Sequence, residues 1–184
     1  MCNLRSRCAG ILCAAVLGMF LSLPVRAIAN DVEFAAARAA IENLLSRYLH
    51  GIDFRDPDMF AATFTADGVL NHGRGITRGH EALREFIRGE ITNDKARASA
   101  AGRNRLAPPR HVISNILIDL HGDSAEVRDY WVYYTTGDDG QPQVSMYGNS
   151  LNEVVKQNGE WLIQRRIVFN EHAEGRQSGV LKVE

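Results

Sequence analysis

Residues 143–169 read QVSMYGNSLNEVVKQNGEWLIQRRIVF, and this stretch is the clearest indication of the fold. It contains two runs rich in apolar and β-branched residues, 143–156 and 161–169, which are joined by Asn158-Gly159. An Asn-Gly pair between two such runs is a strong hairpin signal, because both residues tolerate the positive φ of a tight turn. The stretch therefore predicts two antiparallel strands.

Two further β-rich runs lie upstream, at 111–121 and 125–136. The turn-forming sequence GD at 122–123 separates them, and GDDG at 137–140 separates the second run from the hairpin. Glycine and aspartate clusters between apolar runs are typical of turns between strands. We therefore predict an antiparallel meander of four strands in the C-terminal half of the chain.

The N-terminal half has a helical pattern instead. Apolar residues recur every three or four positions over 32–52, which predicts an amphipathic helix whose N-cap is residue 30 or 31. The sequence Asp-Pro-Asp at 56–58 predicts the start of a short second helix, which Gly68 would end, because proline suits the first helical turn and aspartate the cap. A third helix is predicted from about 80 to 88.

Residues 92–110 lack any apolar periodicity, contain four arginines and end in Pro108-Pro109. A long stretch of this kind is either a functional lid or a disordered loop, and the sequence leaves both interpretations open. Helices that precede an antiparallel meander, rather than alternating with parallel strands, indicate an α+β fold. The helices should then cover one face of a curved sheet.

Composition narrows the function classes. The chain has 184 residues, of which 45% are hydrophobic and 23% charged, as in a single globular domain. Its 21 Lys and Arg residues nearly balance 22 Asp and Glu residues, so the sequence has no basic excess of the kind that nucleic-acid binding requires.

The first 29 residues resemble a secretory signal peptide. Arg5 and Arg7 precede an uncharged apolar run at 9–23, and small-residue cleavage patterns follow at 25–29. The run is shorter than the ~20 residues of a spanning helix, although an uncleaved N-terminal anchor is the alternative interpretation. We expect export to the periplasm or the medium. All three cysteines lie in this segment, so cleavage would leave no disulfide, thiolate metal site or cysteine nucleophile.

Two residues stand out as candidates for chemistry. Asp53 lies just past the first predicted helix, between Ile52 and Phe54, where a carboxylate near an apolar interior needs a partner. It could instead cap the turn at Asp56-Pro57 or bind a backbone amide. His111 and Asn115 fall on one face of the first predicted strand, and that face could open into a cavity under the helices. His111 could equally be a histidine whose ring binds a backbone group.

Other motifs are weaker. The remaining histidines lack the spacing of a metal-ligand motif, so no metal site is predicted. The glycines at 73–79 do not open a βαβ unit, which favours a flexible hairpin over a dinucleotide loop. In the aromatic run YWVYY at 130–134, Trp131 and Tyr133 share one face of the strand, while Tyr130 and Tyr134 share the other. Either pair could line a pocket.

Several short motifs, taken together and in order, resemble the SnoaL-like branch of the nuclear-transport-factor-2-like (NTF2-like) superfamily. They cover nearly all of 35–170 and are Tyr48-x4-Asp53, Asp56-Pro57-Asp58, Phe64-Thr65-x-Asp67, Gly79-His80-Glu81-Ala82-Leu83, Arg110-His111-x3-Asn115, Gly122-Asp123-x-Ala125 and Asn158-Gly159-Glu160-Trp161 with Arg165-Arg166. The resemblance implies a cone-shaped, curved, mostly antiparallel sheet packed on three N-terminal helices, also called a cystatin-like α+β barrel. The domain would span 30–170, with a C-terminal tail at 171–184. By analogy we expect a homo-oligomer, either a dimer or a trimer.

The resemblance also implies a chemistry. Scytalone dehydratase and the hexachlorocyclohexane dehydrochlorinase, both of this group, use an aspartate after the first helix to orient a histidine on the sheet. That histidine is the general base of an elimination, and Asp53 and His111 stand at the matching positions. The residues expected to complete the site by contacting the leaving group, the developing oxyanion or the substrate are Tyr48, Asn149, His72, Asn115 and Trp131.

The resulting prediction is an exported lyase that needs no cofactor or metal and acts on a small hydrophobic substrate, which could be aromatic. It would eliminate water or another small group, such as a one-carbon aldehyde. Two alternatives stay open: a noncatalytic protein that binds a hydrophobic small molecule, and an isomerase or cyclase. The leaving-group chemistry of the two relatives does not carry over, because Ile52 and Tyr48 replace their tyrosine and basic residue and no arginine stands at 154–156.

Overall fold

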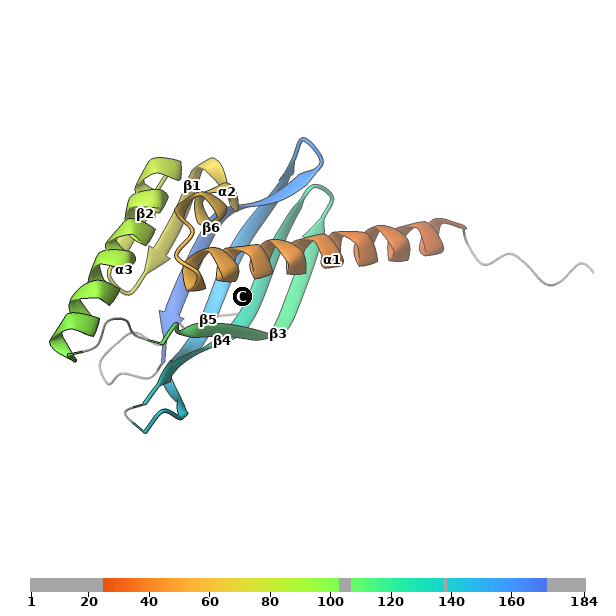
Figure 1. Ribbon diagram of the computed structural model, residues 1–184. Helices are drawn as coiled ribbons and strands as arrows, with labels where there is room; N and C mark the ends of the chain where they lie inside the picture. The colour runs from red at the N-terminus through yellow and green to blue at the C-terminus, as the bar shows by residue number, and fades with distance from the viewer. Residues whose placement is uncertain (1–24, 103–106, 138, 172–184) are drawn as a thin grey trace, which may run out of the picture. The chain divides into compact units, whose positions relative to one another are not determined.

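The computed structural model describes residues 25–102, 107–137 and 139–171 (Figure 1). The chain divides after Ala36 into two units, and the second unit, from Ala37, contains the sheet. The predicted signal peptide lies mostly outside the described residues, as does the predicted tail beyond Glu171, so both stay predictions. Within the described ranges, no helix combines the length and the apolar character that crossing a membrane would require.

Three helices precede most of the sheet: α1 (Val25–Asp53), α2 (Pro57–Ala62) and α3 (His80–Ala100). α1 begins before the expected N-cap. α2 begins as predicted, because the Asp56 carboxylate accepts two backbone N–H groups of its first turn, at 3.1 and 2.9 Å. It ends well before Gly68, which was expected to terminate it, because the chain enters a strand two residues after the helix ends.

The expectation of a loop over 92–110 is wrong for its first half. Residues 92–100 continue α3 without a break, although their apolar periodicity is weak. The sequence KARASA at 95–100 consists mainly of good helix formers, which favours continuation of the helix, and Ala98 is buried within it. Asp94 of this segment also binds Arg55, as described below. Residues 92–100 are therefore helical, whereas residues 103–106 of the expected loop lie outside the described residues, and the interpretation of that part as a lid or a loop stays a prediction.

Six strands form one sheet in the order β2-β1-β6-β5-β4-β3. Their bounds are β1 (Phe64–His72), β2 (Gly75–Arg78), β3 (Arg110–His121), β4 (Ser124–Thr136), β5 (Pro142–Gln157) and β6 (Glu160–Asn170). All neighbours are antiparallel except β1 and β6, so the sheet is mixed. The four predicted strands of the meander are confirmed to within one residue at each end. The predicted α+β class, with a curved and mostly antiparallel sheet, is also confirmed.

β3 contains an irregularity that overturns one expectation. Its pairing register with β4 shifts between Ser114 and Leu117, and Asn115 has a φ of 52°. A bulge of this kind inserts a residue and reverses which side chains face the core. Before the bulge His111 points inward, whereas after it Ile118 is buried and Asn115 is exposed. Asn115 therefore does not share the face of His111.

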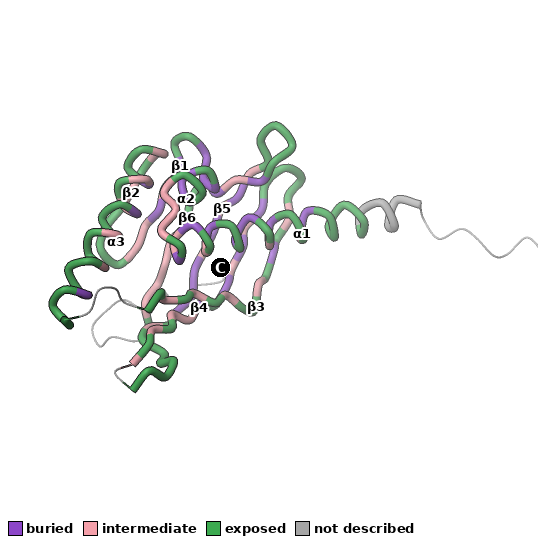
Figure 2. Tube along the Cα trace, in the orientation of Figure 1, coloured by how far each residue is buried: buried purple, intermediate pink, exposed green. Residues whose placement is uncertain are grey.

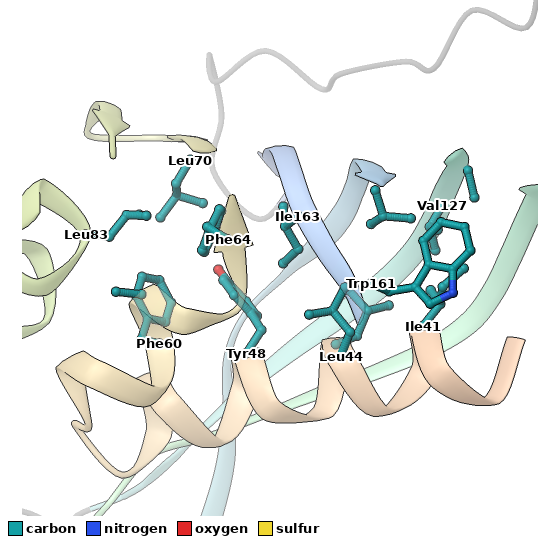
Figure 3. Packing of buried hydrophobic residues seen from close by; sticks show 14 of the residues in the cluster. Ile41, Leu44, Tyr48, Phe60, Phe64, Leu70, Leu83, Val127, Trp161 and Ile163 are labelled. Carbon is teal, nitrogen blue, oxygen red and sulfur yellow. The ribbon is translucent and has the colours of Figure 1, made fainter. Parts of the chain in front are cut away.

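The core lies between α1 and the sheet. Ile41, Leu44 and Tyr48 of α1 face Trp161 and Ile163 of β6 (Figure 3), and all five residues are buried. Figure 2 shows that buried residues line the sheet-facing side of α1 and the strands opposite it. The 3.6-residue period of α1 and the two-residue period of the strands thus meet in one apolar layer.

The corner between α1 and α2 is tightly packed. A Cβ atom on Gly51 would lie 2.8 Å from backbone atoms of Phe60, so the close approach of the two helices requires glycine there. Arg55 then adopts a φ of 56°, which is unusual for a residue other than glycine. Its guanidinium donates to the Ile52 carbonyl and to the Asp94 carboxylate, which hold the corner in place. This corner carries Asp53 at the end of α1.

Candidate functional site

Asp53 and His111 contact each other directly. Nδ1 of the His111 imidazole lies 2.6 Å from Oδ1 of Asp53, and the backbone N–H of His111 donates to Oδ2 of the same carboxylate at 2.9 Å. One carboxylate therefore orients both the ring and the backbone of the histidine. A carboxylate this close to Nδ1 favours a proton on that nitrogen, which leaves Nε2 as the acceptor.

The fold explains why the two residues meet. α1 delivers Asp53 at its C-terminal end, where the helix dipole disfavours a carboxylate that has no donor. His111 lies near the start of β3, which forms one edge of the sheet, so its N–H can point toward Asp53 rather than toward a neighbouring strand. Capping of the following turn by Asp53 is wrong, since Asp56 caps α2, but Asp53 does bind a backbone amide, that of His111. His111 likewise binds a carboxylate rather than a backbone group through Nδ1.

This pair lies on the wall of a cavity of about 960 Å³. The side chain of Asp53 is only 5% exposed, whereas that of His111 is 19% exposed, so the imidazole is the member of the pair that a ligand can reach. The apolar part of the wall includes Leu70, Phe86 and Trp131. A cavity of this size with a mainly apolar wall suits a compact hydrophobic molecule.

Tyr48 and Trp131, two of the expected site residues, also line this cavity. The indole N–H of Trp131 donates to the Asn149 carbonyl at 3.0 Å, so the ring offers the cavity its apolar surface. Tyr48 packs edge-on against Phe64, with ring centroids 5.9 Å apart. Burial raises the pKa of the Tyr48 phenol, while the neighbouring Arg166 guanidinium opposes that rise. Tyr48 therefore stays protonated at neutral pH and can donate.

Beneath Tyr48 lies a buried ion pair that the sequence did not reveal. The Arg166 guanidinium on β6 has its Cζ 4.6 Å from the centroid of the Tyr48 ring and pairs with Asp129 of β4 at 3.3 Å. The two charged side chains are 3% and 0% exposed. Burial opposes the charge of Arg166, but Asp129 and Tyr48 together outweigh it, and the pKa of the guanidinium lies above its ordinary value.

The Asp129 carboxylate has a full set of donors. Ser150 donates to one oxygen at 2.6 Å, and Asn152 donates to the other at 2.9 Å. Asn152 also accepts from Arg166 through its amide oxygen. Nε of Arg166, by contrast, has no hydrogen-bond acceptor among the described residues. Arg166 also lines the cavity, so the part of the wall formed by Tyr48 and Arg166 is polar and positively charged. We call this part the polar pole of the cavity.

Two other expected residues do not reach the cavity. Asn115 is exposed and lies within the bulge of β3. Asn149 is buried, but its amide donates to Glu171 and its side chain does not belong to the cavity wall. Asn149 was predicted on the correct strand, but the sequence does not show which face of that strand points inward. The inward amide of β5 is that of Asn152.

His72, the remaining expected residue, lines the cavity at the end of β1. Its ring packs against Phe86 with centroids 4.9 Å apart. Burial lowers the pKa of His72 below its ordinary value of 6.5, and Arg74 lowers it further, while Glu90 has a smaller opposing effect. The imidazole is thus neutral when the protein is at neutral pH.

We expect the stability of the protein to fall as the pH drops below 6.5, in part because of His72. In this range the unfolded chain binds a proton at His72 that the folded chain does not, so acid favours unfolding, and above this range the contribution vanishes. The variant His72→Gln should show a shallower decline of Tm between about pH 7 and pH 5. The exposed His121→Gln is the matched control. Equal slopes for wild type and His72→Gln would contradict this prediction.

Charged residues surround the part of the cavity formed by α3. Arg55 lies 2.7 Å from Asp94, and Arg97 also binds Asp94. Partial burial opposes ionisation of Asp94, but the hydrogen bonds from Arg55 and Arg97 lower its pKa below the usual range. Arg74 pairs in the same region with Glu90 at 2.6 Å. This cluster was not predicted from the sequence, because the second half of α3 was expected to be a loop.

Tyr133 is the other residue that the structure brings to the site. It stands opposite His111 in the register of β3 and β4, and the two rings pack with centroids 4.6 Å apart. The strand pattern had already placed Tyr133 on the face of Trp131, and both line the cavity. Among the described residues, no group of three or more His, Cys, Asp or Glu side chains is arranged to hold a metal ion.

The family model for the SnoaL-like domain matches residues 33–167 of this sequence. The chain belongs to the SnoaL-like family. A comparison of this SnoaL-like protein with curated proteins gives no match. Family membership and the cavity together make it a protein of the NTF2-like type that binds or modifies a small molecule.

Solved structures agree with this fold. A protein of unknown function from Mycobacterium tuberculosis is similar, with a TM-score of 0.64 and 26% identity over 77% of this chain and 76% of that chain. An NTF2-like protein with a cystatin-like fold from Novosphingobium aromaticivorans has a TM-score of 0.67 and 18% identity over 82% and 92% of the two chains. A structure from Catenulispora acidiphila in complex with S-DNPA has a TM-score of 0.61 and 24% identity over 74% and 94%.

Proposed function

We propose that this SnoaL-like protein is a cofactor-independent lyase. His111 removes a proton from a carbon atom of a small hydrophobic, preferentially aromatic substrate, and elimination of water or another small group follows. The observation that carries the proposal is the 2.6 Å contact between Asp53 and His111 on the wall of an apolar cavity. A buried carboxylate that orients a partly exposed imidazole is the arrangement that a histidine base requires.

Asp53 supports the base in two ways. It accepts a hydrogen bond from the N–H at Nδ1, which keeps the lone pair on Nε2, and its negative charge stabilises the imidazolium that forms when Nε2 takes the substrate proton. The buried surroundings screen this attraction poorly, which strengthens the coupling. The hydrogen bond that the backbone N–H of His111 donates to the same carboxylate restricts the motion of the ring relative to Asp53.

The polar pole of the cavity supplies the second requirement. Proton removal from carbon leaves negative charge on the substrate, and preorganised donors must stabilise it. Tyr48 can donate its phenolic proton to a substrate oxygen, and the adjacent Arg166 adds positive charge. The apolar walls between this pole and His111 favour a substrate with a hydrophobic body and one polar oxygen.

The test uses a probe that needs only a base in an apolar cavity. 5-Nitrobenzisoxazole loses its carbon-bound proton and opens to a coloured cyanophenolate, which absorbance detects. Full-length wild type should accelerate this reaction beyond free imidazole at the same concentration. His111→Ala should lose a factor of about 10² to 10⁴ in kcat/KM. His121→Ala, which removes an exposed histidine from the same strand, should keep the wild-type value.

Two results would overturn the proposal. His111→Ala with nearly wild-type turnover would remove the base from the mechanism. Wild type that binds the probe without accelerating its ring opening would favour the noncatalytic binding protein. The isomerase or cyclase alternative shares the base and differs in the fate of the natural substrate, because mass spectrometry of products detects a loss of mass only after elimination.

A further inference from the structure

We infer that Tyr133 is a second catalytic residue, the acid that protonates the leaving group while His111 removes the substrate proton. This inference rests on the proposed function, because it assigns a partner to the same base. The structure brings the phenol and the imidazole together as neighbours on the cavity wall. The substrate class that follows is a compound whose leaving group is an oxygen atom that needs a proton, such as an alcohol or an aryl ether.

The position of Tyr133 is the first argument. Tyr133 and His111 are directly opposite on β4 and β3, so their side chains emerge on the same face of the sheet. Their rings are tilted by 48° with centroids 4.6 Å apart, and both residues line the cavity. A substrate that offers a proton to His111 therefore lies within reach of the tyrosine.

The Tyr133 hydroxyl is also available to a substrate. Within the described part of the chain it makes no hydrogen bond to a protein group, although the residue is only partly exposed. Tyr48 has different surroundings, since it is almost fully buried and its ring packs against the Arg166 guanidinium. The two tyrosines therefore have different proposed roles. Tyr48 stabilises negative charge on the substrate, and Tyr133 protonates the oxygen of the leaving group.

The charged neighbours of Tyr133 are the third argument. Burial raises the pKa of its phenol, which keeps the proton in place until it is needed. Arg55 and Arg97 act in the opposite direction and stabilise a phenolate, while Asp94 and Glu90 partly offset them. Arg55 is itself fixed by the tight corner after α1, with Nε 2.7 Å from Asp94. The corner that positions Asp53 thus also positions a cation near Tyr133.

The proposed step balances without an outside reagent. Nε2 of His111 takes the proton from carbon, and the electron pair of that C–H bond forms the new carbon–carbon double bond. The carbon–oxygen bond of the leaving group breaks with its electron pair on oxygen, which takes the proton of the Tyr133 hydroxyl. The imidazolium proton then passes to the Tyr133 phenolate, directly or through water, and both side chains return to their starting states.

The test compares two probes that differ in how much their leaving oxygen needs a proton. 5-Nitrobenzisoxazole releases a stable phenolate, whereas unsubstituted 1,2-benzisoxazole releases a more basic one. Tyr133→Phe keeps the ring that packs on His111 and removes only the hydroxyl. It should lose about 10²-fold in kcat/KM on the unsubstituted probe and only a few-fold on the nitro probe. Tyr130→Phe, an exposed change on the other face of β4, should behave as wild type on both.

The outcomes separate the two proposals. Tyr133→Phe that loses the same factor on both probes, or loses nothing on either, would overturn the role of Tyr133 while His111→Ala still abolishes turnover. His111→Ala that keeps its activity would instead overturn the proposed function itself. Circular dichroism and Tm of each variant check that the fold is kept. A leaving-group dependence that is steeper in Tyr133→Phe than in wild type supports the acid, since a purely structural role would not change it.

Discussion

Asp129→Ala is expected to lower the free energy of unfolding by about 3–5 kcal/mol, because it leaves the buried guanidinium of Arg166 without its counter-charge. The Arg166 side chain is 3% exposed and cannot recover its hydration without disrupting the sheet. Its Nε already lacks an acceptor, so no spare partner is nearby among the described residues. Ser150 would lose its acceptor in the same change, and Asn152 would keep only the Val127 carbonyl.

Urea unfolding and thermal scans measure this effect. A change of this size in a chain of this length corresponds to a fall in Tm of roughly 6–20 °C. Asp119→Ala, at an exposed position on β3, is the control and should stay within about 0.5 kcal/mol of wild type. The double variant Asp129→Ala, Arg166→Met removes both charges and should be less unstable than Asp129→Ala alone. An Asp129→Ala protein as stable as wild type would contradict this account of the ion pair.

The strands of the meander could be predicted closely because their signals are local. Each turn contains glycine, asparagine or aspartate at the point where the apolar pattern stops, as at Asn158-Gly159. The end of α3 could not be predicted, because no local signal marks it. Residues 92–100 have no apolar stripe, and propensity together with the Asp94 ion pairs extends the helix through them.

The site was predictable only in part. Resemblance to relatives identified Asp53 and His111, which lie 58 positions apart in sequence and 2.6 Å apart in space. Asn115 fit the same strand pattern, but a bulge displaced it, and a period-two pattern cannot reveal a bulge. Asp129 and Arg166 pair across two strands that are not adjacent in the sheet. No local pattern reports such a contact.

Charge is distributed along the cavity in a way that suits the proposed chemistry. The base is held by one buried carboxylate, Asp53, while the cation Arg166 is held by another, Asp129. Tyr48 lines the cavity together with Asp53, His111 and Arg166, and its ring centroid lies 4.6 Å from the Arg166 guanidinium carbon. A substrate that extends from His111 to Arg166 would meet an acceptor at one end and donors at the other. Carbanion formation requires this polarity.

Asp53→Asn is expected to reduce the turnover of 5-nitrobenzisoxazole by about 10² to 10⁴ while the fold is kept. The native carboxylate accepts two N–H groups of His111, one from the backbone and one from the ring. Asparagine has one acceptor oxygen and one donor amide, so it can satisfy only one of the two. When its oxygen accepts the backbone N–H, its amide faces Nδ1 and donates to it. The imidazole proton then resides on Nε2, and the lone pair that should take the substrate proton is lost.

Asp53→Asn is more informative than Asp53→Ala, because the two variants affect the imidazole tautomer differently. Alanine removes the orientation of the ring but imposes no tautomer, so the asparagine variant should be at least as inactive as the alanine variant. Asp119→Asn, on the same strand as His111 but exposed, should keep the wild-type rate. Nitrogen-15 NMR of the imidazole should show the proton on Nδ1 in wild type and on Nε2 in Asp53→Asn. Wild-type turnover in Asp53→Asn, or an unchanged tautomer, would show that the carboxylate does not direct the base, because an amide would then serve as well as a charge.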